Sequence, residues 1–290
     1  MARHLFFLGK GGVGKSTLSA IEGLKEAGEA KECLIVSLDP AHNQSDIFEG
    51  TFGEKPKTVT KHLQVIEIDL ESSIKKYLKG IESKIKESYR YLAAFNLENQ
   101  FDIIRYSPGI EEYALLQAYN RISDKYVNMD TIIFDMPPTA LTLKFFSLPK
   151  LSLLWLGKLQ NLRNQIIEKR EIITKIKFGS KTIETDKISK NLHDQASLYQ
   201  NIYKNFQDSS ITHLILVMNP DTLSLNESLK IRERIQSLNF IISCVMVNKY
   251  QGQEKSIFNQ FNESTIQYFA LNQTPLTGLQ NLKNYLKSLS

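Results

Sequence analysis

Short runs of apolar residues alternate along the chain with longer segments in which apolar residues recur every three or four positions. Apolar runs of about four to eight mostly β-branched or aromatic residues are typical of buried strands, and the longer pattern is typical of amphipathic helices. The apolar runs lie at Leu5–Leu8, Cys33–Leu38, Val65–Ile68, Thr131–Phe134, Leu214–Met218, Ile241–Val247 and Tyr268–Leu271. This alternation predicts an α/β fold, a doubly wound and mostly parallel sheet whose faces are covered by helices.

Two segments are too long to serve only as connections between strands. Their helical stripes predict a helical subdomain, formed by segments at about 71–105 and 151–207 of a single domain that spans residues 1–290. The stripes comprise Ile74, Leu78, Ile81, Ile85, Leu92 and Phe95, then Trp155, Leu159, Leu162, Ile166, Ile173 and Ile176, and finally Leu192, Ala196, Tyr199, Tyr203 and Phe206. Such stripes usually pack on a sheet or on each other, and a client-binding surface is the alternative. The polar residues 179–191 favour a mobile loop.

A glycine-rich loop follows the first predicted strand and opens a helical pattern. It consists of Gly9, Lys10, Gly11, Gly12, Val13, Gly14, Lys15, Ser16 and Thr17. This spacing and context predict a P-loop, whose backbone N–H groups and following helix N-terminus bind phosphates. We expect Lys15 to contact the β- and γ-phosphates of ATP and the Ser16 hydroxyl to bind Mg²⁺.

Two carboxylates stand at the ends of predicted strands, at the edge of the sheet where bound phosphates are expected. Asp39 opens the segment Asp39-Pro40-Ala41-His42-Asn43 and is placed to orient the attacking water, with a simple Asp-Pro turn as the alternative. Asp135 ends the apolar run Ile132–Asp135, a Walker B pattern that predicts a Mg²⁺ ligand acting through a water molecule.

The second lysine of the loop, Lys10, makes this P-loop resemble that of the deviant Walker A ATPases. In that family the first lysine reaches across a dimer interface to the partner's nucleotide, so the resemblance implies a homodimer. It gives catalytic roles to Lys10, Lys15 and Asp39. The alternative is a solvated lysine on a loop.

Further segments make almost the whole chain similar to the arsenite-pump ATPases and the ATPases that target tail-anchored proteins. They are Asp39–Asn43, Pro108–Glu112, Asp135 with Pro138-Thr139, Thr142-Leu143, Ser147–Pro149, Leu223–Leu225 with Glu227-Ser228, and Val247-Asn248. By this resemblance, Asp39 belongs to switch I, and Asn248 with the neighbourhood of Pro220 surrounds adenine. Switch II would comprise Asp135, Pro138, Thr139 and Ala140.

The resemblance implies a Mg²⁺-dependent ATPase that works as a nucleotide-switched homodimer and acts as a targeting or chaperone-like factor. Its other partners would be a hydrophobic membrane-protein client or a membrane receptor. One alternative is the ATPase motor subunit of an anion or metalloid transporter, and another is a weakly hydrolysing nucleotide-binding adaptor. A membrane-positioning ATPase is a further alternative, because Leu279, Leu282, Leu286 and Leu289 form a C-terminal apolar stripe.

The chain departs from this family pattern in four respects. The family's proline and glutamate before the last glycine are replaced around Ala270 and Pro275, so the base pocket is expected to differ in detail. The second P-loop and the cysteine cluster of the bacterial arsenite-pump ATPases are missing, so activation by arsenite is not expected. Ala140-Leu141 stands where the family has Gly-His, so switch II lacks the freedom of glycine at positive φ. Cys33 and Cys244 lack the Cys-x-x-Cys spacing of the zinc-binding members, so no zinc is expected.

Composition changes this picture little. The net charge of +5 comes from 36 basic and 31 acidic residues in mixed-sign stretches, which predicts a solvated surface and no nucleic-acid partner. The first predicted strand begins almost at residue one, and no apolar run approaches the roughly 20 residues that span a bilayer. We therefore expect neither a signal peptide nor a transmembrane segment. The two cysteines lie inside apolar runs, which agrees with a reducing, cytoplasmic location.

Overall fold

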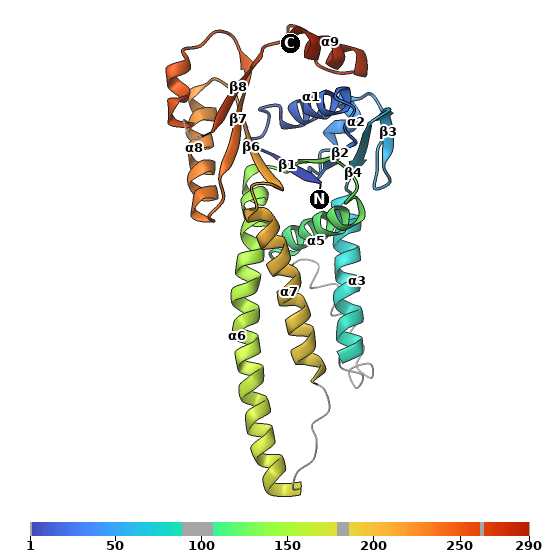
Figure 1. Ribbon diagram of the computed structural model, residues 1–290, viewed down its shortest axis with the longest axis vertical. Helices are drawn as coiled ribbons and strands as arrows, with labels where there is room; N and C mark the ends of the chain where they lie inside the picture. Colours follow the sequence, from blue (N-terminus) through green and yellow to red (C-terminus); the bar gives the residue numbers. More distant parts are fainter. Residues whose placement is uncertain (1, 89–106, 179–185, 262–263, 290) are drawn as a thin grey trace. The chain divides into compact units, whose positions relative to one another are not determined.

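The computed structural model describes residues 2–289 except 89–106, 179–185 and 262–263; the side chains of 84–88 and 170–178 are also outside the description (Figure 1). Strands and helices alternate along the described chain. In chain order they are β1 (Arg3–Leu8), α1 (Lys15–Gly28), β2 (Cys33–Ser37), α2 (Asn43–Ile47), β3 (Lys57–Thr60), β4 (Leu63–Glu67), α3 (Leu70–Ser88), α5 (Ile110–Lys125), β5 (Thr131–Asp135), α6 (Thr139–Phe178), α7 (Lys187–Gln207), β6 (Thr212–Met218), α8 (Thr222–Ser237), β7 (Ile242–Tyr250), the 3₁₀ helix η2 (Lys255–Phe261), β8 (Thr265–Ala270) and α9 (Leu279–Leu289).

The eight described strands form one sheet in the order β3-β4-β2-β5-β1-β6-β7-β8. All neighbours run parallel except β3 and β4, which confirms the predicted doubly wound, mostly parallel sheet. The sequence pattern missed β3, because the residues of Lys57–Thr60 are exposed or half-buried and form no apolar run.

The strand register brings three loops together at one edge of the sheet. Asp135 at the end of β5 stands opposite Phe7 of β1 and Ser37 of β2. Because parallel strands share their carboxyl edge, the glycine loop after β1 and the Asp39 segment after β2 lie beside the end of β5. The sheet order therefore joins the predicted phosphate-binding loop to both predicted carboxylates.

Each face of the sheet has its own core, because alternate strand residues point to opposite faces. Leu5 and Phe7 of β1 belong to a mostly aliphatic cluster with residues of α1 and α9. His4 and Phe6 instead join an aromatic cluster; its other members are Tyr119, Phe134, Phe145, Phe146, Phe206 and Phe240. Figure 1 shows α1 and α9 on one side of the sheet and α5 on the other.

His4 is the polar member of the aromatic cluster. Its ring Nδ1 lies 3.2 Å from the Tyr119 hydroxyl. Burial, with a smaller effect of the N-terminal charge, lowers the pKa of His4 to about 4. The imidazole is therefore neutral at physiological pH.

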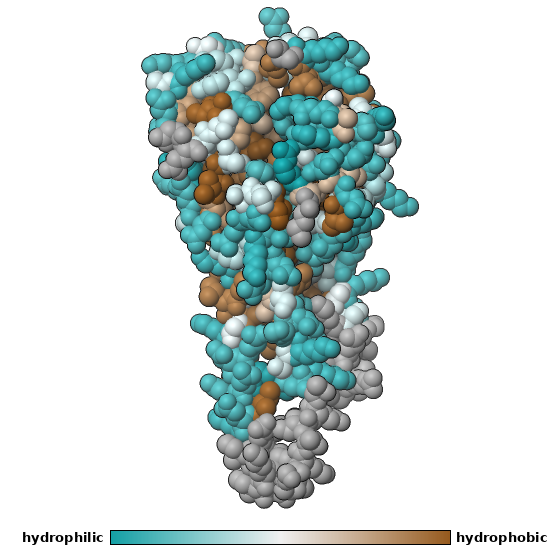
Figure 2. Space-filling model, viewed as in Figure 1, coloured by the Kyte–Doolittle hydropathy of each residue, from teal (hydrophilic) through white to brown (hydrophobic). Residues whose placement is uncertain are grey.

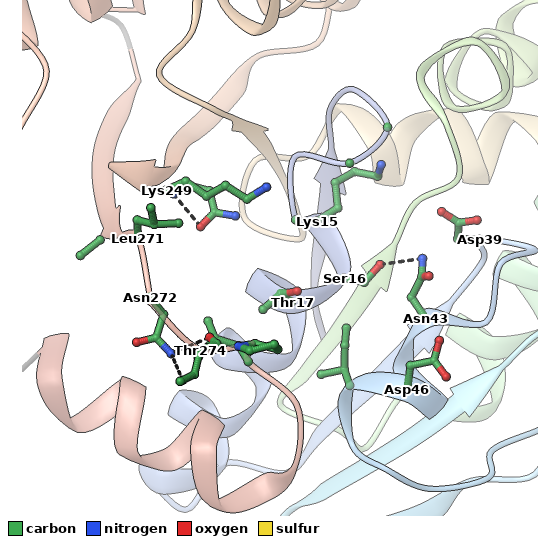
Figure 3. A pocket seen from close by; sticks show the side chains of 18 of the residues that line it. Lys15, Ser16, Thr17, Asp39, Asn43, Asp46, Lys249, Leu271, Asn272 and Thr274 are labelled. Carbon is green, nitrogen blue, oxygen red and sulfur yellow. Dashed lines mark hydrogen bonds between the residues drawn. The ribbon is translucent and has the colours of Figure 1, made fainter. Parts of the chain in front are cut away.

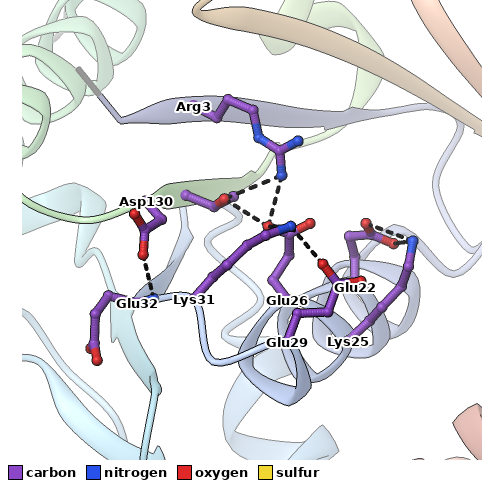
Figure 4. A network of polar contacts seen from close by, with 9 residues as sticks. Arg3, Glu22, Lys25, Glu26, Glu29, Lys31, Glu32 and Asp130 are labelled. Carbon is purple, nitrogen blue, oxygen red and sulfur yellow. Dashed lines mark hydrogen bonds and ion pairs between the residues drawn. The ribbon is translucent and has the colours of Figure 1, made fainter.

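A network of ion pairs joins the last turns of α1 to the amino ends of the strands (Figure 4). Glu26 accepts hydrogen bonds from Arg3 Nη2 at 2.7 Å and from the Thr131 hydroxyl at 2.9 Å, and Lys31 Nζ lies 3.4 Å away. Burial alone would raise the pKa of Glu26, but these donors and cations outweigh it and lower that pKa. A buried carboxylate is tolerated here because it is fully paired.

Contacts divide the chain into two compact units. The first comprises Met1–Tyr77, Pro108–Phe146 and Phe206–Ser290 and holds the sheet; the second comprises Leu78–Ser107 and Ser147–Asn205. The predicted helical segments at 71–105 and 151–207 overlap the second unit, and the single-domain boundaries stay a prediction. Of the predicted stripes, Leu92 and Phe95 and the side chains of Ile85, Ile173 and Ile176 lie outside the described residues.

The predicted loop at 179–191 is too long, because α7 already begins at Lys187. Within the second unit, Arg163 of α6 donates from Nε and Nη2 to the two carboxylate oxygens of Asp186, at 2.9 and 3.0 Å. Asp186 Oδ1 also accepts from the backbone N–H of Ile188, so the pair fixes the start of α7. Residues 179–185 of that predicted loop lie outside the described part. Throughout the described chain, no helix combines the length and apolar character needed to cross a membrane.

Candidate nucleotide-binding site

A cavity of about 460 Å³ opens at the carboxyl edge of the sheet, within the first unit (Figure 3). Figure 3 shows the start of α1 between Asp39, Asn43 and Asp46 on one side and Lys249, Leu271 and Asn272 on the other. The predicted site residues that line the cavity are Gly11, Gly12, Gly14, Lys15, Ser16, Thr17, Asp39, Pro138 and Asn248. Gly9, Lys10, Val13, Asp135, Thr139, Ala140 and Pro220 are not in this lining.

Two glycines of the loop are required by their surroundings. A Cβ on Gly9, whose φ is +145°, would lie 2.2 Å from the backbone oxygen of Val217. A Cβ on Gly14, whose φ is +93°, would lie 2.3 Å from Asn248 Nδ2. The loop can therefore pack against β6 and β7 only where side chains are missing.

Lys15 is buried at the base of the cavity. Its Nζ donates to the backbone oxygen of Lys10 at 3.3 Å. Burial lowers the pKa of Lys15, while the negative charges of Asp135, Asp39 and Glu227 act in the opposite direction. A buried cation with this orientation gains a strong partner when an anionic phosphate enters the cavity.

Ser16 lines the cavity at the start of α1, and the Asp135 carboxylate lies buried beside it. Asp135 is fully buried, and burial raises its pKa to about 6, although nearby Ser16, Gln44 and Lys15 oppose the shift. Asp135 Oδ2 accepts a hydrogen bond from Gln44, but Oδ1 accepts none from the described residues. A hydroxyl beside a buried carboxylate oxygen that lacks a partner fits the oxygen ligands and bound waters that Mg²⁺ prefers. Asn43 Nδ2 also donates to the Ser16 hydroxyl oxygen at 3.3 Å.

Asp39 lines the cavity at the start of the segment that joins β2 to α2. Its Oδ1 accepts from the backbone N–H of Ala41 at 3.0 Å. The chain then turns through His42, at φ +51°, and enters α2. Asp39 therefore has the turn role that was the alternative to catalysis, and its side chain also belongs to the cavity lining. Its role in orienting water stays a prediction.

Lys10 forms an ion pair with α8, and the same carboxylate is held by the first residue of α6. Its Nζ lies 3.7 Å from Glu227 Oε2 on α8. The Thr139 hydroxyl donates to Glu227 Oε1 at 3.2 Å and lies 3.3 Å from the Gly9 carbonyl oxygen. Glu227 belongs to a segment that resembles the family, but no site role was expected for it, because nothing in the sequence places α8 beside the loop. Ala140 lies in the first turn of α6 and has no positive φ, so this conformation needs no glycine there.

The far side of the cavity was only partly anticipated. Asn248 Nδ2 donates to the Val13 carbonyl oxygen at 2.8 Å, and Asn248 Oδ1 accepts from the backbone N–H of Lys249 at 2.9 Å. Asn248 therefore fixes the loop itself as well as lining the cavity. The segment after β8 also lines it with Leu271, Asn272, Thr274, Pro275 and Leu276, a region that the sequence indicated only by its departure from the family pattern around Ala270 and Pro275.

The two cysteines lie on different strands, β2 and β7. Burial raises the pKa of the Cys33 thiol well above its usual range and that of Cys244 to about 11. Both thiols are therefore protonated at neutral pH. A thiol in this state is a poor metal ligand.

Comparison with known proteins agrees with this P-loop geometry. Residues 2–273 match the ArsA ATPase family, described as anion-transporting ATPases. The chain belongs to this family. It is 29% identical to an ATPase ASNA1 homolog of Entamoeba dispar, over 85% of this chain and 76% of the relative. The ATPase GET3 of Komagataella phaffii is 28% identical, over 99% and 89% of the two chains.

A third relative carries a different name. A putative arsenical pump-driving ATPase 2 of Aquifex aeolicus is 28% identical, over 85% of this chain and 80% of the relative. The chain is thus an ATPase of the ArsA family, as its sequence predicted. The roles of single residues in this ArsA-family ATPase stay predictions.

Proposed function

We propose that this ArsA-family ATPase is a cytoplasmic, Mg²⁺-dependent homodimer that binds hydrophobic membrane-protein segments in one nucleotide state and releases them in another. The observation that carries the client part is an exposed apolar stripe on α6. Its members and exposed fractions are Leu151 (49%), Leu154 (61%), Trp155 (68%), Leu159 (42%), Leu162 (54%) and Ile166 (46%).

The α6 stripe has the spacing of one helix face. Apart from the adjacent pair Leu154 and Trp155, its residues recur at intervals of three or four positions, which places them in a row along the helix. Contiguous exposed apolar patches are uncommon on monomeric soluble proteins and usually mark a binding surface. Figure 2 shows hydrophobic side chains at the surface among hydrophilic ones.

Covering the α6 stripe with a client would contribute several kcal/mol of hydrophobic free energy to binding. A tryptophan side chain presents about 150–250 Å², and Trp155 is 68% exposed. Covering it removes roughly 100–170 Å² from water, which contributes about 2.5–4 kcal/mol at about 25 cal/mol per Å². A hydrophobic client helix would gain this contribution together with those of the neighbouring leucines.

In the catalytic site, the loop N–H groups and Lys15 would bind the phosphates of ATP. Ser16 and, through water, Asp135 would hold Mg²⁺, which would neutralise negative charge on the phosphates when bound. Asp39 would orient the attacking water in line with the γ-phosphate. Hydrolysis would then change the contacts of the two switch segments with the nucleotide.

The dimer part of the proposal depends on Lys10. Its ion pair with Glu227 joins side chains that are 41% and 34% exposed, so it contributes on the order of 0–1 kcal/mol. Such a weak contact is readily exchanged for a phosphate oxygen of a partner's nucleotide. Lys10 is thus free to act in trans without disrupting the fold.

The dimer is tested by light scattering with and without Mg-ATP, together with ATP turnover. Wild type is expected to dimerise and turn over, Asp39→Asn to stay a nucleotide-bound dimer, and Lys10→Ala to lose turnover. Lys283→Ala on α9, an exposed lysine far along the chain from the loop, is the control and should behave like wild type. Unchanged size for every variant and nucleotide would rule out the switched dimer, and absent turnover would favour the adaptor alternative.

The client surface is tested by fluorescence, because Trp155 is the single tryptophan of the chain. A hydrophobic peptide of transmembrane length should shift its emission to shorter wavelength in only one nucleotide state. Leu162→Ser should weaken peptide binding, whereas Ile241→Ser, which alters a more exposed apolar residue outside the stripe, should not. Equal peptide affinity of the two variants, or a peptide affinity that is the same in every nucleotide state, would exclude the proposed client site.

A motor subunit of an anion transporter is the second candidate, favoured by the name of the Aquifex relative and by the family description. Affinity purification from membranes separates the two candidates. Recovery of a stoichiometric polytopic membrane protein that stimulates turnover would support the motor. Recovery of single-span membrane proteins, lost in Leu162→Ser, would support the client carrier.

A further inference from the structure

Gln44 is a buried polar residue that the predicted mechanism does not use. It is the second residue of α2 and directly follows the segment Asp39–Asn43. Its side chain is fully buried. Its Nε2 donates toward Ser19 Oγ at 2.9 Å, the Ser16 carbonyl oxygen at 3.1 Å and Asp135 Oδ2 at 3.1 Å.

The chemistry of these partners fixes the orientation of the Gln44 amide. A backbone carbonyl only accepts hydrogen bonds, and an ionised carboxylate only accepts them. The Ser19 hydroxyl donates its hydrogen to the Ser16 carbonyl at 2.8 Å, so its oxygen is left to accept from Gln44. All three partners therefore require the nitrogen, and the flipped amide would face three acceptors with its oxygen.

Gln44 consequently holds one oxygen of Asp135 and leaves the other unengaged. Oδ2 is the oxygen that accepts from Gln44, while Oδ1 has no partner among the described residues. A carboxylate with one oxygen fixed can turn less, so its second oxygen keeps a defined direction. That second oxygen is the one available to a water of the Mg²⁺ shell.

Gln44 also connects three parts of the site. Its backbone continues the Asp39 segment, while its side chain contacts the helix after the P-loop and the carboxylate that ends β5. The neighbouring Asn43 contacts the same helix through the Ser16 hydroxyl. A displacement of the Asp39 segment must therefore change the support of Asp135.

We infer that Gln44 is a positioning residue that orients Asp135 toward Mg²⁺ and couples the Asp39 segment to it. This inference rests on the Mg²⁺ role of Ser16 and Asp135 in the proposed function. It does not depend on the dimer or on the client. Loss of a hydrogen bond that orients a metal ligand typically weakens metal binding about 10–100-fold.

The test measures the affinity for ADP by calorimetry with and without Mg²⁺. It also determines the Mg²⁺ midpoint, which is the Mg²⁺ concentration that gives half of the full increase in ADP affinity. Gln44→Met conserves volume and removes the donor. We expect unchanged affinity for ADP in the absence of Mg²⁺ and a midpoint for Mg²⁺ raised about 10-fold or more. Gln44→Leu, a second apolar replacement, should raise the Mg²⁺ midpoint by the same amount. It serves as the test if Gln44→Met proves unstable in unfolding experiments.

Ser19→Ala is the matched control, because it removes one partner of Gln44 and leaves the contact with Asp135 intact. Its midpoint for Mg²⁺ should stay within about twofold of wild type. If Ser19→Ala raises the Mg²⁺ midpoint as much as Gln44→Met does, Gln44 only packs α2 against α1 and the inference is overturned. An unchanged Mg²⁺ midpoint in both Gln44→Met and Gln44→Leu would overturn it as well. A wild type without any Mg²⁺ enhancement would overturn it together with the proposed metal site. Failure of dimer switching alone would leave it standing.

Discussion

Alanine substitutions at three P-loop glycines should destabilise the protein by different amounts, because the surroundings of an added Cβ differ at each position. In Gly9→Ala the new Cβ would approach the Val217 backbone oxygen to 2.2 Å, and no side-chain rotation can relieve a contact with backbone. In Gly14→Ala the obstacle is the amide of Asn248, which can move at the loss of its bond to Val13. In Gly11→Ala the Cβ would meet nothing within 4 Å, and φ is not positive.

The expected losses of unfolding free energy follow from these contacts. For Gly9→Ala, overpacking of about 1–3 kcal/mol adds to backbone strain of about 1–3 kcal/mol, so we expect a loss of about 2–6 kcal/mol. For Gly14→Ala we expect about 1–3 kcal/mol, mainly from φ at +93°. Gly11→Ala should change stability by no more than about 1 kcal/mol, since its native conformation accepts a Cβ.

Urea unfolding at 25 °C without nucleotide is the assay, since it reports the fold separately from phosphate binding. The midpoints should rank Gly11→Ala above Gly14→Ala and Gly14→Ala above Gly9→Ala. Because domains of this kind are stable by only about 5–15 kcal/mol, the Gly9→Ala loss is readily measured. A Gly9→Ala protein as stable as Gly11→Ala would refute the close approach of this loop to β6.

Three further predictions concern other parts of the molecule. Burial lowers the pKa of His4 from 6.5 to about 4, so the unfolded chain binds this proton at a higher pH than the folded chain does. The free energy of unfolding should therefore fall by about 3 kcal/mol as the pH drops from 6.5 to 4. His4→Phe should flatten the dependence of the urea midpoint on pH in this range. Arg163→Lys should lose the bidentate contact with Asp186 and speed amide exchange in the first turn of α7 about fivefold, which corresponds to about 1 kcal/mol; equal exchange in both proteins would contradict the proposed anchoring. Asp39→Asn should reduce turnover by at least about 100-fold while ADP affinity, measured by calorimetry, stays within a few-fold; retained turnover would remove Asp39 from the catalytic step.

The glycine-loop motif and the strand pattern were readable in the sequence because each rests on local chemistry. Gly9–Thr17 has a spacing that only close approach of phosphate to backbone explains, and its position after an apolar run gives the context. The runs that became β1, β2, β5 and β6 are buried on both faces, so they are continuously apolar. The family assignment over residues 2–273 extends these signals to nearly the whole chain.

Elements whose stability comes from distant partners were not readable. The strand β3 pairs with β4 through its backbone, and backbone pairing leaves no apolar pattern. The start of α7 depends on Arg163, which lies 23 positions before Asp186. Such contacts become visible only when two remote segments have been placed together.

The sequence by itself determined the P-loop, the fold class and the family, because these depend on residue type and short spacing. Only the tertiary structure decided which residues complete the site. Gln44 looks like an ordinary polar residue of a short helix until the fold places its amide beside Asp135. Glu227 likewise gains its contact with Lys10 only because α8 lies beside the loop. Hydrogen bonds act over about 3 Å between residues far apart in the chain, and no local pattern records that distance.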